Sequence, residues 1–210
     1  MKRRRIRKRH QHQFFLCQKT YRRALIDLIE ADPVRMRALR CVQALNLPQC
    51  YIAAGFIRNL VWDALHKYSS STLNDIDVVF YDHEDTSTER EQYLEQLLQK
   101  TMPEMTWQVR NQARMHEKHQ DPPYASTLDA MRFWPEKETA IAVRLDMNQR
   151  CEVIAAFGVQ SLFELKLSHN PARPWQVFQQ RLDDKQWLTH WPKLTVTTQC
   201  SVAAKPIEHE

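Results

Sequence analysis

Two aspartates at the start of an apolar run have the spacing of a metal-binding pair. Asp75 and Asp77 precede a β-branched and aromatic run, residues 78–81, that predicts a buried strand. Alternation along a strand places both carboxylates on one face, where they repel each other. A divalent cation removes the repulsion: carboxylates suit Mg²⁺ held jointly with substrate phosphates, with Mn²⁺ as the alternative. Two such ions could support phosphoryl or nucleotidyl transfer. The competing interpretation is a turn capped by Asn74 and Asp75, with Asp77 exposed at an edge.

The segment before this strand predicts a strand, a glycine turn and a helix. Residues 51–54 form a short apolar run that ends on Gly55, and residues 56–66 return to helical spacing. The chain has only two glycines, Gly55 and Gly158, where average usage would give about fifteen. We therefore expect each glycine at a position where no side chain fits. Because the two are far apart, glycine-rich dinucleotide and P-loop fingerprints are excluded.

The remaining patterns predict one mixed α/β domain. A chain of 25.1 kDa with 43% hydrophobic residues can bury one sizeable core. Apolar spacing and capping residues predict helices over 18–31, 33–45, 89–100, 126–133 and 174–188, and one opened by a capping box at Ser161–Glu164. Strands are predicted over 107–110 and in a hairpin of 139–145 with 151–156. The polar stretch 111–124 is predicted to be a loop of functional length.

The positive charge of the chain is concentrated at its start. The net charge is +5, but seven basic residues lie within residues 2–9, and the rest carries 23 basic against 25 acidic residues. We expect a disordered basic arm at 1–17, a domain at 18–197 and a disordered tail at 198–210. The arm is a candidate contact for nucleic-acid phosphates, and a solvated tail is the competing interpretation.

The termini and cysteines indicate a cytoplasmic protein. The sequence shows no signal peptide and no apolar run near the roughly 20 residues of a membrane span. The five cysteines are odd in number and scattered, so we expect reduced thiols rather than a zinc site or a disulfide framework. The six tryptophans are expected in the core rather than as base-stacking platforms.

Two motifs resemble the signature of the polymerase β-like nucleotidyltransferase superfamily. They are AAGFIRN at residues 53–59 and NDIDVV at residues 74–79. The tRNA-nucleotidyltransferase branch reads G-G-x-V-R-D in the first motif, so Gly55, Ile57 and Arg58 match, while Ala54 and Asn59 replace a glycine and an aspartate. The resemblance implies an α+β fold with a central mixed sheet and flanking helices.

A closer resemblance covers residues 35–195. The segments AGFIRNLVWDALH, LNDIDVVFYD, WQVRNQARMH, PYASTLDAMRFWPEKETAIAVRL and EVIAAFGVQSLFELKL are similar to a bacterial family of small nucleotidyltransferase-like proteins of largely unassigned substrate. In the family's A-P-F-G-L pattern this chain has Ala156 and Val159, and neither change touches a carboxylate. The resemblance implies Mg²⁺-dependent transfer of a nucleoside monophosphate from an NTP to a hydroxyl of a small molecule, a protein or an RNA.

The resemblance also implies a third carboxylate on a later hairpin strand. Glu152 occupies that place among apolar residues, and Asp146 at the hairpin turn is its rival. Asp75, Asp77 and Glu152 are thus the expected metal ligands and catalytic groups.

Nucleotide contacts are expected from two segments: Gly55, Phe56, Arg58 and Asn59 in the first motif, and Asn111 and Arg114 in the distinctive segment RNQARMH. Arg58 has a structural ion pair as its competing role. The alternative function is a non-catalytic nucleic-acid or partner-binding module on the same fold, contacted through the basic arm.

Overall fold

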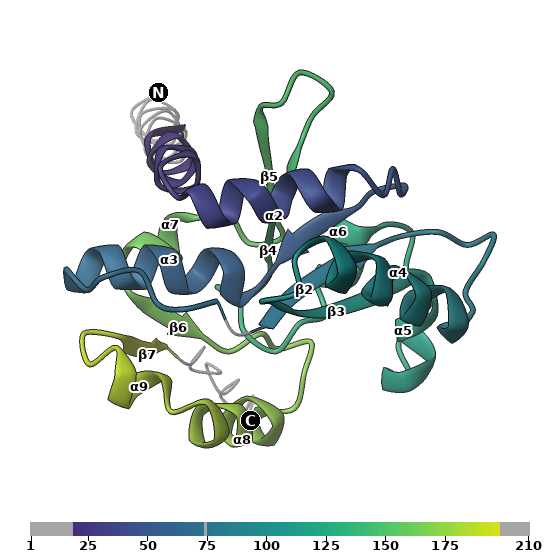
Figure 1. The fold of residues 1–210 in the computed structure, drawn as a ribbon. Coiled ribbons are helices and arrows are strands. Elements are labelled where there is room, and N and C mark those ends of the chain that lie inside the picture. The colour runs from purple at the N-terminus through teal and green to yellow at the C-terminus, as the bar shows by residue number, and fades with distance from the viewer. Residues whose placement is uncertain (1–18, 74, 198–210) are drawn as a thin grey trace, which may run out of the picture.

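A five-stranded mixed sheet organises the chain in the computed structural model, which describes residues 19–73 and 75–197 (Figure 1). The predicted arm at 1–17 and tail at 198–210 lie outside the described residues. The strands follow the order β3 (Thr106–Asn111), β2 (Asp75–Phe80), β1 (Tyr51–Ala53), β4 (Ile141–Leu145) and β5 (Cys151–Ala155). Within this five-stranded sheet the β2–β3 pair is parallel, and the other three pairs are antiparallel.

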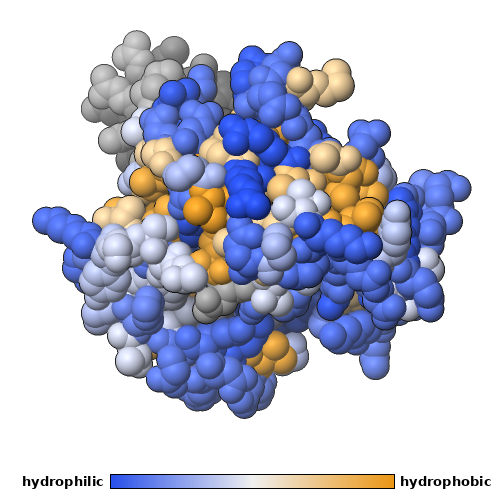
Figure 2. Space-filling model, in the orientation of Figure 1, coloured by the Kyte–Doolittle hydropathy of each residue, from blue (hydrophilic) through white to orange (hydrophobic). Residues whose placement is uncertain are grey.

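Helices cover the sheet, and α8 and α9 form a further layer together with a second, two-stranded sheet. The first described helix spans residues 19–30, followed by α2 (Pro33–Gln43), α3 (Gly55–His66), α4 (Thr88–Thr101), α5 (Gln112–His119), α6 (Thr127–Met131), α7 (Gln160–Phe163), α8 (Trp175–Lys185) and α9 (Trp187–His190). A parallel pair, β6 (Lys166–Ser168) and β7 (Thr195–Thr197), lies with α8 and α9 below α3 and the large sheet in Figure 1. Hydrophilic residues cover most of this lower layer (Figure 2).

The two faces of the sheet differ, as period-two alternation requires. Ile52, Ile76 and Val143 point into the main core, which also contains residues of the 19–30 helix, α2, α3 and α4. Val79 and Ala53 point to a smaller apolar cluster that is completed by Met131 and other residues. Asp75 and Asp77 share the second face, because they alternate with the main-core residues of β2.

Most predicted elements are present, including the helix predicted over residues 33–45, which is α2. The Asp32 carboxylate accepts hydrogen bonds from the amides of Val34 and Arg35, and Pro33 is the first residue of α2. In the described residues no helix has the length and hydropathy of a membrane span. Cys41, Cys50 and Cys151 are free thiols, as predicted; Cys17 and Cys200 lie outside the described part.

Two local predictions are wrong. The segment 111–124 is not a continuous loop, because Asn111 caps helix α5 through a bond from the Ala113 amide; α5 escaped the apolar pattern because it buries only Gln112. The capping box does not form, because Ser161 lies inside α7, and Glu164 ends that helix instead of supporting its start. The Glu164 carboxylate accepts bonds from Gln160 and Lys166.

The glycine prediction is half right. Gly158 has a φ of 76°, which favours glycine. At Gly55, however, a Cβ would meet Asn59 Nδ2 at 3.5 Å, an ordinary contact, so a methyl group fits. The unusual backbone belongs to Ala54, with φ 57° and ψ −120°, a conformation that side chains rarely adopt. The turn between β1 and α3 therefore carries backbone strain one residue before the glycine.

Replacing Ala54 with glycine should relieve that strain. We expect Ala54→Gly to raise the free energy of unfolding by about 1 kcal/mol in a denaturant titration. Ala64→Gly, at an exposed position in α3, is the matched control and should lower it by about 1 kcal/mol. Equal destabilisation by both substitutions would show that the backbone at Ala54 is unstrained.

Candidate active site

A cavity of about 1000 Å³ lies where the start of β2, the start of α3 and the α8–α9 layer meet. Ala54 and Gly55 line it from the turn after β1, and Trp187 and Trp191 line it from the opposite layer. Its polar and charged lining residues are Arg35, Arg58, Asn59, Ser71, Thr72, Asp75, Asp77, Gln108, Thr139, Arg181, Lys185, Gln186, Thr189 and His190. The cavity therefore contains both aspartates of the DxD motif and most of the first predicted motif.

Asp75 and Asp77 open into this cavity from the first half of β2. Asp75 is exposed and Asp77 is half-buried between Ala53 of β1 and Gln108 of β3. Burial raises the pKa of Asp77, and the positive charge of Arg58 lowers it, while the neighbouring Asp75 raises it. The predicted same-face arrangement is present, and it leaves Asp77 in a setting that a bound cation would stabilise.

The donor set fits one side of a Mg²⁺ site. Mg²⁺ is usually held by one or two carboxylates together with water and substrate phosphates, so two aspartates are sufficient. Within residues 19–73 and 75–197, no group of three His, Cys, Asp or Glu side chains forms a complete metal cage. A cation at this pair would thus take its remaining ligands from the substrate and from water.

The start of α3 faces the same space with free backbone donors. Ala54 is its N-cap residue and supplies no side-chain cap, so the amides of Gly55 and Phe56 have no acceptor inside the helix. These amides and the positive end of the helix dipole favour an anion. The Phe56 side chain, by contrast, is buried in the main core beneath the Arg35 guanidinium.

Arg58 is a buried cation at the base of the cavity. Its side chain donates from Nη1 to Thr139 Oγ1 over 2.7 Å and from Nη2 to Asn59 Oδ1 over 3.1 Å. The guanidinium carbon lies 5.2 Å from the ring centre of Trp62 and 4.6 Å from that of Trp187. No carboxylate of the described residues lies within ion-pair distance of it, so the structural ion pair considered for Arg58 does not form. Burial lowers its pKa to about 10, so Arg58 stays charged at neutral pH.

Glu152 lies outside the cavity. It sits on β5, three strands from β2, which corresponds to about 14 Å along the sheet. Its carboxylate pairs with Arg144 Nε over 2.6 Å, and the side chain is 44% exposed. Asp146, its rival, accepts bonds from the amides of Asn148 and Arg150 and stabilises the hairpin turn. The structure brings neither carboxylate to Asp75 and Asp77.

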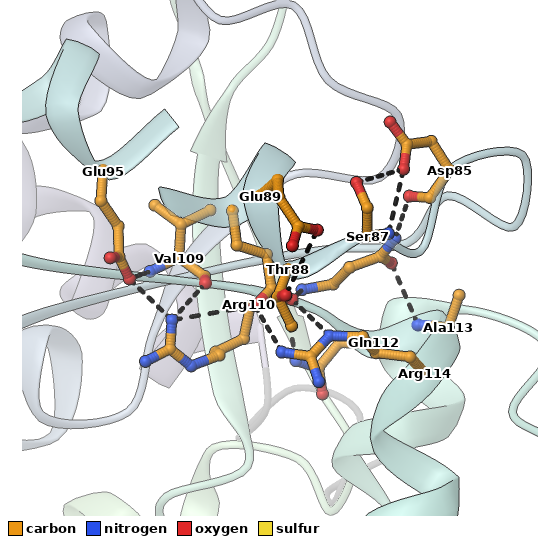
Figure 3. Close-up of polar contacts among 12 residues, drawn as sticks. Asp85, Ser87, Thr88, Glu89, Glu95, Val109, Arg110, Gln112, Ala113 and Arg114 are labelled. Carbon is orange, nitrogen blue, oxygen red and sulfur yellow. Dashed lines mark hydrogen bonds and ion pairs between the residues drawn. The ribbon is translucent and has the colours of Figure 1, made fainter. Parts of the chain in front are cut away.

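Asn111 and Arg114 also lie away from the cavity, at the opposite end of β3 and in α5. Asn111 is fully buried, and its Nδ2 donates to the carbonyls of Asp82 and Asp85. Arg114 pairs with the buried Glu91, with Nη2 to Oε2 at 2.5 Å. Figure 3 shows the surrounding polar network, in which Arg114 and Arg110 extend from α5 and β3. Both predicted contacts are occupied in holding α4, β3 and α5 together.

The sequence analysis did not predict the cavity residues that come from the α8–α9 layer. Arg181, Lys185 and Trp187 come from the α8–α9 layer, far along the chain from the DxD motif. Their only signal was the aromatic and basic composition of the predicted 174–188 helix, which is equally typical of a packed surface helix. Trp187 is 3% exposed, which confirms the prediction of a core tryptophan, yet it also lines the cavity.

A nucleotidyltransferase family model matches residues 40–196. The chain belongs to this nucleotidyltransferase family. The match includes both aspartates, the α8–α9 layer and all of the cavity lining except Arg35. It confirms the family and the enzyme class that the two motifs predicted.

The solved structures similar to this chain include one enzyme domain and two longer enzymes. An NMR structure described as revealing the head domain of a CCA-adding enzyme is similar with a TM-score of 0.75 and 28% identity, over 83% of this chain and 95% of that one. A complex of a CCA-adding enzyme with CTP has a TM-score of 0.48 and 12% identity, over 84% of this chain and 43% of that one. A complex of a tRNA-processing enzyme has a TM-score of 0.48 and 15% identity, with 76% and 43% covered.

This nucleotidyltransferase thus spans less than half of the two longer chains. No curated protein sequence matches it significantly. The first structural match confirms the predicted α+β, polymerase β-like fold.

Removing the buried charge of Asp77 should stabilise the protein without added metal. Because burial raises the folded-state pKa of Asp77 above its ordinary value, the free energy of unfolding falls as pH rises through that raised pKa. We expect Asp77→Asn in chelator to raise the melting temperature by a few degrees at pH 7 and to have no advantage near pH 3.

Asp183→Asn removes the same charge from an exposed position of α8 and should change little at either pH. A lower melting temperature for Asp77→Asn at pH 7 would mean that the carboxylate stabilises the fold through a partner.

Proposed function

We propose that this nucleotidyltransferase moves a nucleoside monophosphate from an NTP to a hydroxyl acceptor in the cavity between β2, α3 and α8. The observation that carries the proposal is the convergence of opposite charges there. The Asp75–Asp77 pair, the uncapped start of α3 and the buried Arg58 all line one cavity of about 1000 Å³. The two carboxylates can bind a divalent cation, and the amides and Arg58 can bind phosphate oxygens. Together they can bind the complex of a divalent cation with a triphosphate.

Asp75 and Asp77 would hold Mg²⁺, or Mn²⁺ in its place. When bound, the metal neutralises phosphate charge and favours the deprotonated form of the acceptor hydroxyl. Both carboxylates would hold it from one strand, so the spacing between the two aspartates is set by the β2 backbone.

The other residues act on the phosphates. The amides of Gly55 and Phe56 would donate hydrogen bonds to phosphate oxygens. Arg58, whose guanidinium donates to Asn59 Oδ1, would add positive charge at the base of the cavity. The acceptor oxygen forms a bond to the α-phosphorus, the bond from that phosphorus to the β-phosphate oxygen breaks, pyrophosphate leaves, and the hydroxyl proton passes to water. Donors placed in advance lower the barrier because they need no reorganisation as charge develops.

The acceptor is a hydroxyl of a small molecule, a protein or an RNA. The similarity to the head domain of a CCA-adding enzyme makes an RNA hydroxyl the first acceptor to test. Glu152, Asn111 and Arg114 have no part in this proposal, because their side chains are paired outside the cavity. Action in the cytoplasm and phosphate contacts by the basic arm stay predictions from the sequence.

Loss of either aspartate should abolish transfer. We expect Asp77→Asn and Asp75→Asn to lower the incorporation of labelled NTP into acceptors of a cell extract, with Mg²⁺, by more than about a hundredfold. Asp183→Asn should leave it unchanged, because that carboxylate is outside the cavity lining.

Equal incorporation by wild type and the two variants would contradict the proposal. The alternative binding module makes a different prediction: deletion of residues 1–10 would abolish nucleic-acid binding, and both aspartate variants would retain it.

A further inference from the structure

Four cations line the cavity, and three of them already have polar partners. Arg35 forms an ion pair with Asp32 and donates from Nε to the Phe56 carbonyl over 2.8 Å. Arg181 pairs with the fully buried Glu136, with Nε to Oε1 at 2.5 Å, and Arg58 donates to Thr139 and Asn59. Within the part of the chain that the structure describes, the side chain of Lys185 has no hydrogen bond or ion pair.

Lys185 faces the DxD pair across the cavity. It is the last residue of α8, its side chain is exposed, and it lines the same space as Asp77. Its positive charge helps to hold down the pKa of Asp77, which burial raises. The acidic groups near it on its own helix, Asp183 and Asp184, are exposed, and Asp184 accepts a bond from Gln180. The ammonium is therefore available to a ligand bound at the aspartates.

The layer that carries Lys185 is anchored next to it. Trp187, two residues further on, packs its ring on the Arg58 guanidinium and is 3% exposed. Trp191 donates from Nε1 to Asp63 Oδ1 over 2.9 Å, which ties the end of α9 to α3. Lys185 thus extends from a backbone whose distance to α3 is set by buried contacts.

We propose that Lys185 binds the β- and γ-phosphates of the NTP and stabilises the charge on the departing pyrophosphate. The inference rests on the proposed function. Phosphates held at Asp77 and by the amides of α3 would lie in the cavity that the α8 layer closes from the other side. There the exposed ammonium of Lys185 has no partner among the described residues. As the bond between the α-phosphorus and the bridging oxygen breaks, its electron pair stays on pyrophosphate. The ammonium keeps its proton and donates a charge-assisted hydrogen bond.

The test compares ligands with and without the terminal phosphates on the full chain. Calorimetry with Mg²⁺ would measure the binding of ATP, CTP, pyrophosphate and the two nucleoside monophosphates to wild type, Lys185→Gln and Lys185→Arg. We expect Lys185→Gln to weaken NTP and pyrophosphate binding about tenfold and to leave monophosphate binding unchanged, and Lys185→Arg to restore most of the loss.

Lys100→Gln is the matched control, because Lys100 is an exposed lysine in the last turn of α4 and does not line the cavity. It should bind all ligands like wild type. If Lys185→Gln binds NTP and pyrophosphate as tightly as the wild type, the proposed role of Lys185 is wrong, while the proposed function stands. The same holds if Lys185→Gln loses equal affinity for mono- and triphosphates. No binding of any NTP or of pyrophosphate by the wild type would instead overturn the proposed function together with this inference.

Discussion

The contact between Arg58 and Trp187 joins the two halves of the cavity. Arg58 belongs to the first turns of α3, while Trp187 starts α9, and the guanidinium lies 4.6 Å from the ring centre. A cation on an aromatic ring is attracted by the negative face of the ring, and the attraction strengthens where water is excluded. Arg58 is 7% exposed and Trp187 is 3% exposed, so the contact is dry. This contact sets how closely α8, with Lys185 at its end, approaches Asp75 and Asp77 of β2.

Burying Arg58 without an ion pair has a cost, which is visible in its lowered pKa of about 10. Hydrogen bonds to Thr139 and Asn59 and the two tryptophan rings offset part of it. Ionised groups are seldom kept in such a setting unless they pair with another charge or serve a ligand. A nucleotide phosphate would supply the missing negative charge, so the same contact that assembles the cavity also favours an anion inside it.

The turn from β1 to α3 shows a second constraint. The chain must bend sharply after Ala53 so that the α3 amides face the cavity, and Ala54 adopts φ 57° there. The related motif has glycine at this position, and this chain does not. Gly55 occupies an ordinary conformation, and its missing side chain leaves the approach to the α3 amides open.

The sequence by itself determined the fold class, the family and the placement of Asp75 and Asp77 side by side on one face of a strand. Asp75 and Asp77 share a face because strand alternation is local, and the β1–α3 turn follows from a short apolar run, a glycine and a helical pattern. Asn111 and Arg114 could not be judged that way, because their partners Asp82, Asp85 and Glu91 come from other elements.

Only the tertiary structure decided which distant side chains meet. Glu152 was a reasonable third carboxylate by its place in the hairpin, but sheet order puts β4 and β1 between it and β2. Lys185 carried no signal, because one lysine on an amphipathic helix resembles any other until Trp187 packs on Arg58. A local sequence pattern reflects the conformational preferences of residues that are close along the chain. The distance between two side chains across a cavity depends instead on buried contacts between elements that are far apart in the sequence.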